Sequence, residues 1–270
     1  MAMVSPLFML VSFAVGAGIL GSLFLIIAIS VDAWESVTFR MDVLSQYTNN
    51  SSKKYSVDLA ASENDFSKFT KNETTFVNGS EQSRLNNYFL FATFTGIWRT
   101  CDILSDDSRN RLETLKGETM KRCYVYVSEY DEENTNLSDQ MKGIGGMQNS
   151  AASCIIVSLI NLAAAAILGT ISIVQRQVSA CMVTGVLYGT AALFCAFGLT
   201  IFHTKMYYEK YQCYSFTVEK LPGPACDARV VEVGWAIYFA WAAIVVCIIG
   251  FALWVFATRT LRVIISKTML

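Results

Sequence analysis

The most reactive side chains in this 270-residue chain belong to eight cysteines and one histidine, His203. Cys101 and Cys123 lie in one long polar stretch, and Cys213 and Cys226 lie in a second. In an oxidising compartment we expect one disulfide within each stretch; pairing between the stretches is the alternative, because spacing does not fix connectivity. The remaining cysteines are expected to pack as small apolar side chains; they are Cys154, Cys181, Cys195 and Cys247.

The sequence lacks the residue sets that enzymes and metal sites need. One histidine cannot supply a metal cluster or several alternative triads, and we find neither a phosphate-binding glycine loop nor zinc-spaced cysteines. The basic residues are dispersed rather than gathered on one segment. The sequence therefore predicts no enzymatic activity, no metal, no cofactor and no nucleic-acid partner.

The composition is that of a membrane protein, with 53% hydrophobic and 16% charged residues. Four segments lack charged residues and exceed the ~20 residues that a membrane-spanning helix needs. A cleaved signal peptide is the alternative for the first, but its apolar run is too long and no basic residue precedes it. Without charges in the spans, no ion path is expected. The predicted helices are residues 7–29, 150–174, 180–202 and 234–256.

Two features of these helices bear on their packing. Small residues such as Gly18, Gly185 and Gly189 allow backbones to approach closely, within the chain or against a partner helix. Asn161 is strongly polar and lies near the middle of its helix, so we expect an interhelical hydrogen bond.

The charge distribution predicts the orientation of the chain. All 22 acidic residues lie within residues 32–139 and 209–232. Basic residues without acidic ones mark cytoplasmic segments, and here these are Arg176, Arg259, Arg262 and Lys267. We therefore expect a cytoplasmic N-terminus (1–6), link (175–179) and tail (257–270), and outer loops at 30–149 and 203–233.

Glycosylation triplets support this orientation. Five Asn-x-Ser/Thr triplets occur, all in the first predicted outer loop, and at least some are expected to carry glycan. They begin at Asn49, Asn50, Asn72, Asn78 and Asn136.

The first outer loop alternates strand-like segments with a polar insertion. Apolar alternation or aromatic enrichment predicts strands, and a further strand is expected in the second loop. Residues 44–86 have few large apolar side chains and four of the five triplets, which predicts a mobile glycosylated insertion. The predicted strands are residues 37–43, 87–94, 97–103, 122–127 and 213–218.

The segment "TGIWRTC", residues 95–101, contains the most specific pattern. Gly96 permits a turn or a close backbone approach. Trp34 and Trp98 are expected where protein meets lipid headgroups, and Arg99 either stacks on an aromatic ring or pairs with an acidic residue.

This pattern resembles the claudin superfamily, through Trp34, Gly96-Ile97-Trp98, Cys101 and Cys123. The closer similarity is to the branch of transmembrane AMPA-receptor regulatory proteins (calcium-channel gamma-like subunits) and germ-cell-specific-gene-one-like proteins. Gly234 and Trp235 in "VGWAIYFAW" match the start of the fourth helix in that branch. The resemblance covers about two thirds of the chain.

The resemblance implies a left-handed bundle of four transmembrane helices with a small extracellular five-stranded antiparallel sheet. It also implies one of two roles in the plasma membrane: an auxiliary subunit that contacts pore-forming subunits of an ionotropic glutamate receptor, through its sheet and its third and fourth helices, or a claudin-like junction protein. A glycosylated insertion would obstruct the close contact of a junction seal, which favours the first role and a synaptic location.

The last three residues suggest a further partner. Thr268-Met269-Leu270 matches the Thr-x-hydrophobic carboxylate pattern that PDZ domains bind. The pattern is short, and an accidental match is the alternative.

Overall fold

The structure is a computed structural model, and it describes residues 4–50, 55–58, 66–77, 80–126, 139–175, 177–214 and 221–268. The chain divides into two compact units. The helix unit contains Met1–Val31, Asn149–Phe202 and Trp235–Leu270, and the sheet unit contains Asp32–Gln148 and His203–Gly234.

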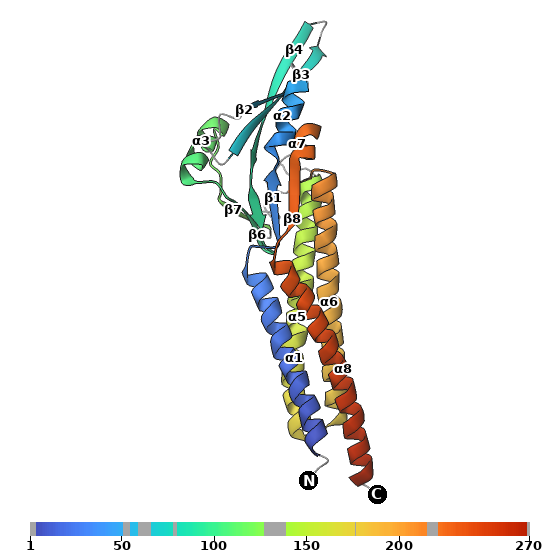
Figure 1. Cartoon of the computed structure of the whole chain (residues 1–270). Coiled ribbons are helices and arrows are strands. Elements are labelled where there is room, and N and C mark those ends of the chain that lie inside the picture. Colours follow the sequence, from blue (N-terminus) through green and yellow to red (C-terminus); the bar gives the residue numbers. More distant parts are fainter. Residues whose placement is uncertain are drawn as a thin grey trace. The chain divides into compact units, whose positions relative to one another are not determined.

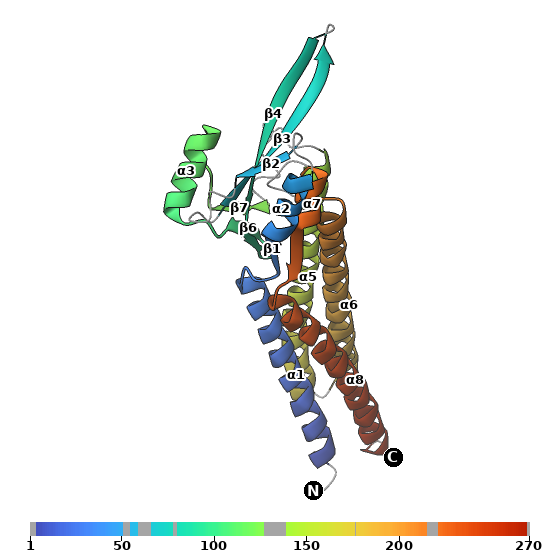
Figure 2. The ribbon, with the colours of Figure 1, turned by 45° about the horizontal axis from the view of Figure 1, so that its top comes forward.

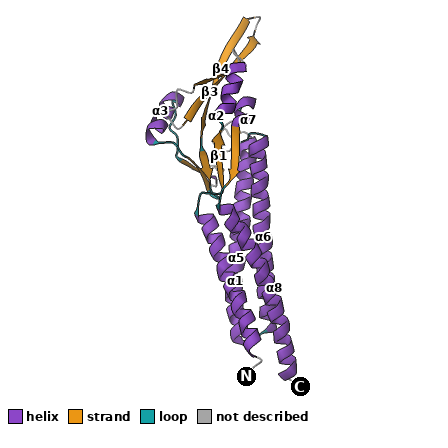
Figure 3. Cartoon of the chain, viewed as in Figure 1, coloured by secondary structure: helices purple, strands orange, loops and turns teal. Residues whose placement is uncertain are grey.

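Four long helices carry the predicted membrane spans (Figures 1 and 3). Each is long and apolar enough to cross a bilayer, as the uncharged segments predicted. Two of them continue beyond the predicted spans, so that residues 139–148 and 203–211 belong to the sheet unit. The helices are α1 (Val4–Ser30), α5 (Asp139–Gln175), α6 (Val178–Tyr211) and α8 (Ala236–Thr268).

Glycines in the helix unit accommodate aromatic side chains of neighbouring helices. Tyr188 of α6 lies against Gly250 of α8, where an added Cβ would be 2.7 Å from its ring. Trp254 of α8 lies against Gly185 of α6, where an added Cβ would be 3.2 Å from the Trp254 Cβ atom. The small residues of α6 therefore serve packing within the chain.

Hydrogen bonding between these helices differs from the prediction for Asn161. Its Nδ2 donates to the Val157 carbonyl 2.9 Å away, one turn earlier in α5, so the expected interhelical bond is wrong. Ser158 instead links two helices, because its hydroxyl donates to the Ala191 carbonyl of α6 at 2.8 Å.

The sheet unit is built on a five-stranded antiparallel sheet with the strand order β7-β6-β5-β1-β8. Four strands come from the first long loop and one from the second. The strands are β1 (Glu35–Phe39), β5 (Thr93–Thr95), β6 (Arg99–Asp102), β7 (Cys123–Val125) and β8 (Arg229–Val233). Together with the helices, this sheet confirms the expected claudin-like fold class.

One predicted strand is too long, and another lies mostly outside the described residues. The strand expected at 37–43 ends at Phe39, and helix α2 (Met41–Asn50) follows because Leu44 is buried against Phe69 and Leu90. The fifth strand is β8, which pairs with β1 at five positions, whereas the segment predicted at 213–218 begins in coil and lies outside the described residues from 215 onward.

The region expected to be a mobile insertion contains an ordered second sheet, in the order β2-β3-β4. Strands β3 (Phe66–Val77) and β4 (Ser80–Phe91) pair from Phe66↔Phe91 to Val77↔Ser80, and β2 (Tyr55–Asp58) pairs with the first half of β3 (Figure 2). Strands in this region were not predicted, because the few large apolar residues of the region bury against α7 (Gly223–Ala228), which comes from the second loop.

Helix α3 (Asp106–Lys116) completes the sheet unit. The Ser105 hydroxyl caps its first turn by accepting from the Ser108 amide, and Gly117 ends it with a φ of 75°, a conformation that favours glycine. Leu112 of this helix is buried with Phe66 and Leu104.

Candidate functional site

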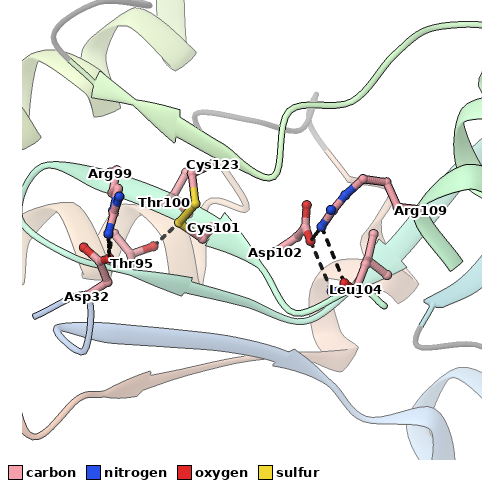
Figure 4. Close-up of a disulfide and its surroundings, with 9 residues drawn as sticks. All are labelled: Asp32, Thr95, Arg99, Thr100, Cys101, Asp102, Leu104, Arg109 and Cys123. Carbon is pink, nitrogen blue, oxygen red and sulfur yellow. Dashed lines mark hydrogen bonds and ion pairs between the residues drawn. A yellow bond between two sulfur atoms is a disulfide. The ribbon is translucent and has the colours of Figure 1, made fainter. Parts of the chain in front are cut away.

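The Gly-Ile-Trp-Arg segment forms a tight connection between β5 and β6. The Gly96 amide donates to the Arg99 carbonyl at 2.8 Å. A Cβ on Gly96 would lie 2.9 Å from Asp32 Cα, so this glycine permits the close backbone approach that its sequence position predicted. Arg99 pairs with the Asp32 carboxylate through two nitrogens, at 2.6 and 2.7 Å (Figure 4), which decides for the acidic partner over an aromatic one.

The same segment is fixed to the first turns of α5. Gln148 Nε2 donates to the carbonyls of Gly96 and Ile97, both at 2.9 Å. Gln148 and Ile97 are buried, and Trp98 is half-buried. A buried amide that satisfies two backbone carbonyls holds this connection in one conformation.

Trp34 joins three strands through its backbone. Its amide donates to the Thr95 carbonyl at 2.9 Å, and its carbonyl accepts from the Gly234 amide at 2.7 Å. The Trp34 side chain is fully buried. The predicted position of Trp34 among lipid headgroups is therefore wrong, because the ring belongs to the core.

Each long loop has its own disulfide. Cys101 and Cys123 occupy opposite positions on β6 and β7, with Cα atoms 4.1 Å apart (Figure 4). Cys213 and Cys226 are joined across a separation of 13 residues. Asp102 follows Cys101 in β6. Its carboxylate accepts hydrogen bonds from Arg109 of α3 and from the Leu104 amide, which ties that helix to the sheet.

Replacing Cys101 and Cys123 by serine should lower the free energy of unfolding of the sheet unit by about 3 kcal/mol, because the crosslink closes a loop of 22 residues. Denaturant unfolding in detergent measures the change. Cys154→Ser, at a free and half-buried cysteine, is the matched control and should change much less. Equal midpoints for the double variant and wild type would contradict the assigned crosslink.

Four buried charged residues lie close together in the sheet unit. Lys205 Nζ is 2.8 Å from Glu35 Oε2 and 3.4 Å from Glu209 Oε2. Arg229 of β8 donates to the carbonyls of Glu209 and Tyr214, both at 3.0 Å. This set, called the buried charge cluster below, consists of Glu35, Lys205, Glu209 and Arg229; Lys205 has no exposed surface and Glu35 only 1%.

The cluster keeps Glu35 ionised. Burial is the largest single influence and raises the pKa of this carboxyl group. The Lys205 ammonium, the hydrogen bonds with Glu209 and Lys205, and the Arg229 charge together outweigh it and hold the pKa below its ordinary value. A lowered pKa in the folded state contributes stability above the unfolded value near ~4.3, and this stability is lost as the pH falls through the folded value. Burial also raises the pKa of the neighbouring Tyr126 to about 12, so its hydroxyl stays protonated.

Sequence reasoning missed this cluster because charged residues beyond an uncharged span are ordinarily solvated. One signal was present. Lys205 and Glu209 are four residues apart on one helix, immediately after the predicted span, and Glu35 follows the motif residue Trp34.

The other predicted site residues are distributed over the chain. Asn49 and Asn50 end α2, and Asn72 lies in β3, whereas Asn78 and Asn136 lie outside the described residues. Trp235 is 51% exposed beside α8, and Thr268 is the last residue of α8, with Leu270 beyond the described part. Over the described ranges, no group of three or more His, Cys, Asp or Glu residues is placed to hold a metal ion.

The arrangement of four apolar helices and an antiparallel sheet closed by β8 agrees with a comparison of the sequence with protein families. The family described as PMP-22/EMP/MP20/Claudin tight junction matches residues 19–255. The chain belongs to this family. Claudin-family proteins are non-enzymatic membrane proteins, so the present member is a multi-pass membrane protein of that kind. No curated protein matches the sequence.

Proposed function

We propose that this claudin-family protein is an auxiliary subunit of a ligand-gated ion channel, of the ionotropic glutamate receptor type, and that it changes channel gating or trafficking. The Thr95–Cys101 segment and the Gly234-Trp235 pair support the regulatory branch of the superfamily. The observation that carries the proposal is the paired ribbon of β3 and β4.

This ribbon favours a partner in the same membrane over a partner in a facing membrane. Its strands pair at twelve positions, and eleven steps of ~3.3 Å make it about 36 Å long. Asn72, in the middle of β3, begins a glycosylation triplet. A glycosylated ribbon of this length would add hydrated bulk to the outer loops, which must interlock closely in a junction seal, whereas a channel beside the protein in the same membrane leaves room for it.

The proposal places both termini in the cytoplasm and the sheet unit outside the cell, in the plasma membrane of a synapse. Basic residues at the tail, such as Arg259 and Arg262, support this orientation. The sheet would then contact the extracellular layer of the channel, and α6 and α8 would contact its peripheral helices. Phe197 of α6 and Val245 of α8 are 58% and 56% exposed, which suits such a contact.

Removal of N-linked glycans from the protein expressed in animal cells should reduce its apparent mass, because the triplets lie outside the cell in this orientation. Asn72→Gln should remove one glycan if Asn72 is used. Gel mobility before and after glycosidase treatment makes the measurement. Unchanged mobility of wild type would contradict the proposed topology.

Recordings of glutamate-evoked currents test the function. Coexpression with pore-forming subunits should change desensitisation or deactivation. A ribbon-shortened variant, in which Asn-Gly replaces residues 72–85, joins the opposed pair Lys71 and Asn86 by a two-residue hairpin turn. This shortened protein should still be able to contact a channel beside it in the same membrane, and so should still change the currents. Unchanged currents, together with intramembrane strands of wild type in freeze-fracture of junction-free cells, would favour the junction role.

A PDZ scaffold is a second proposed partner, supported by Thr268 and Leu270. Leu270→Ala should abolish capture of the protein on immobilised PDZ domains, whereas Arg262→Ala, at an exposed residue of α8, should not. Equal capture of Leu270→Ala and wild type would contradict this partner.

A further inference from the structure

An apolar groove runs along α1 within the helix unit. Seven residues of α1 between Leu7 and Ile19 form one side of the groove, which has a volume of about 520 Å³. The other side is formed by Ser172 and Ile173 of α5, Cys181 of α6, and Ala257 and Leu261 of α8. A second hollow of about 390 Å³ shares Val15 and Ile19 with the first and reaches Trp254 of α8. We call the two together the α1–α5 groove; both helices are visible in the lower part of Figures 1 and 2.

The groove has the length of one half of a bilayer. From Leu7 to Ile19, α1 rises by about 18 Å at ~1.5 Å per residue. One leaflet of a hydrocarbon core that is ~30 Å thick measures roughly 15 Å. A lipid chain that enters at the Leu7 end would therefore place its methyl end near Ile19 and Trp254.

The dimensions of the groove suit a slender apolar occupant. Its volume of about 520 Å³ extends along ~18 Å of α1, which accommodates a single chain of methylene groups.

The packing of the bundle leaves this space open. A Cβ on Gly16, which lines the groove, would meet no atom within 4 Å, whereas a Cβ on nearby Gly18 would overlap Tyr188. Phe8 and Phe13 of α1 are 71% and 68% exposed, so the groove continues the apolar outer surface of α1. The Ser172 hydroxyl already donates to the Gly169 carbonyl at 2.8 Å, so it needs no polar ligand.

We propose that the α1–α5 groove binds one acyl chain of a membrane phospholipid, with the methyl end directed toward Trp254. The acyl chain would make van der Waals contacts with both helices where the helices do not contact each other. The lipid is then a resident part of the helix unit, distinct from the surrounding bilayer. This inference does not depend on the proposed channel partner.

Tryptophan quenching in nanodiscs tests the proposal. Trp254 lines the second hollow and is only 1% exposed, so bromine atoms near the methyl end of a chain held in the groove should lie closer to it than those of the surrounding bilayer. The Trp254 signal is obtained as the difference between the wild type and Trp254→Phe, which removes the contribution of exposed Trp235 and Trp241. In brominated phospholipid this difference should fall at least about two-fold.

Gly16→Leu should restore the Trp254 signal, because leucine fills the groove. Gly143→Leu is the control, since a Cβ at Gly143 of α5 also meets nothing within 4 Å but lies outside the groove; it should be quenched like wild type. Ser12→Phe fills the groove one turn nearer the N-terminus and serves if Gly16→Leu melts at a lower temperature than wild type. An unquenched Trp254 in wild type, or quenching that persists in both filling variants, would overturn the proposal.

Discussion

Replacing Lys205 by methionine should lower the free energy of unfolding of the sheet unit by about 3–5 kcal/mol, the usual cost of breaking a buried ion pair. The substitution removes the ammonium group that lies 2.8 Å from Glu35 and 3.4 Å from Glu209. Two buried carboxyl groups then face each other without that charge. Denaturant unfolding in detergent, followed by near-ultraviolet circular dichroism, measures the loss.

Two further variants separate charge from packing. Lys210→Met changes an exposed lysine of the same helix and should alter the free energy by less than about 0.5 kcal/mol. Glu35→Gln combined with Lys205→Met should be less destabilised than Lys205→Met alone, because one unpaired charge has been removed with its partner. If Lys205→Met were as stable as wild type, the buried charge cluster would not support the sheet.

Gly234→Ala should prevent β8 from pairing with the start of β1. An added Cβ would lie 2.0 Å from the Ala33 carbonyl oxygen and 2.5 Å from its carbon, and both are backbone atoms that no rotamer change can move. The bond from the Gly234 amide to the Trp34 carbonyl, 2.7 Å long, would also break. We expect a loss above about 4 kcal/mol, measured as loss of the monodisperse peak in size-exclusion chromatography.

Gly223→Ala is the matched control for this prediction. Gly223 begins α7 in the same unit, and a Cβ there meets nothing within 4 Å. This variant should elute and unfold like wild type. Equal behaviour of both alanine variants would show that β8 tolerates separation from β1.

The helices were predictable because their signal is local. Each span is an uncharged run longer than a bilayer requires. The assignment of a membrane-spanning helix therefore depends only on the residues of the span itself. The strand positions were less predictable. The strand at 229–233 was missed because it forms by pairing with β1, nearly 200 residues away in the chain.

Burial of polar and aromatic groups was the main failure of sequence reasoning. Trp34 has the amphipathic ring of a headgroup residue, but its backbone bonds to Thr95 and Gly234 place the ring in the core. Glu35 and Lys205 are 170 residues apart, so neither reveals that the other will neutralise it. In the described part of the polar region 44–86, Leu44 and Phe69 bury against α7, which supplies apolar surface that the region itself lacks.

The family motif was predictable in its residues and only partly in its roles. The close approach at Gly96 was expected, and an acidic partner was one of two alternatives for Arg99; the structure supplies Asp32 for each. The clamp by Gln148 was not expected, because a glutamine 51 residues beyond Ile97 carries no pattern. Together these contacts hold the connection between β5 and β6 in place.

Purification of the protein from native tissue in mild detergent, followed by identification of the chains that co-purify, tests the proposed function most directly. The account predicts pore-forming subunits of an ionotropic glutamate receptor, retained with wild type in amounts comparable to the protein itself. Recovery of the protein without any channel subunit, and with copies of itself from adjoining cells instead, would contradict it.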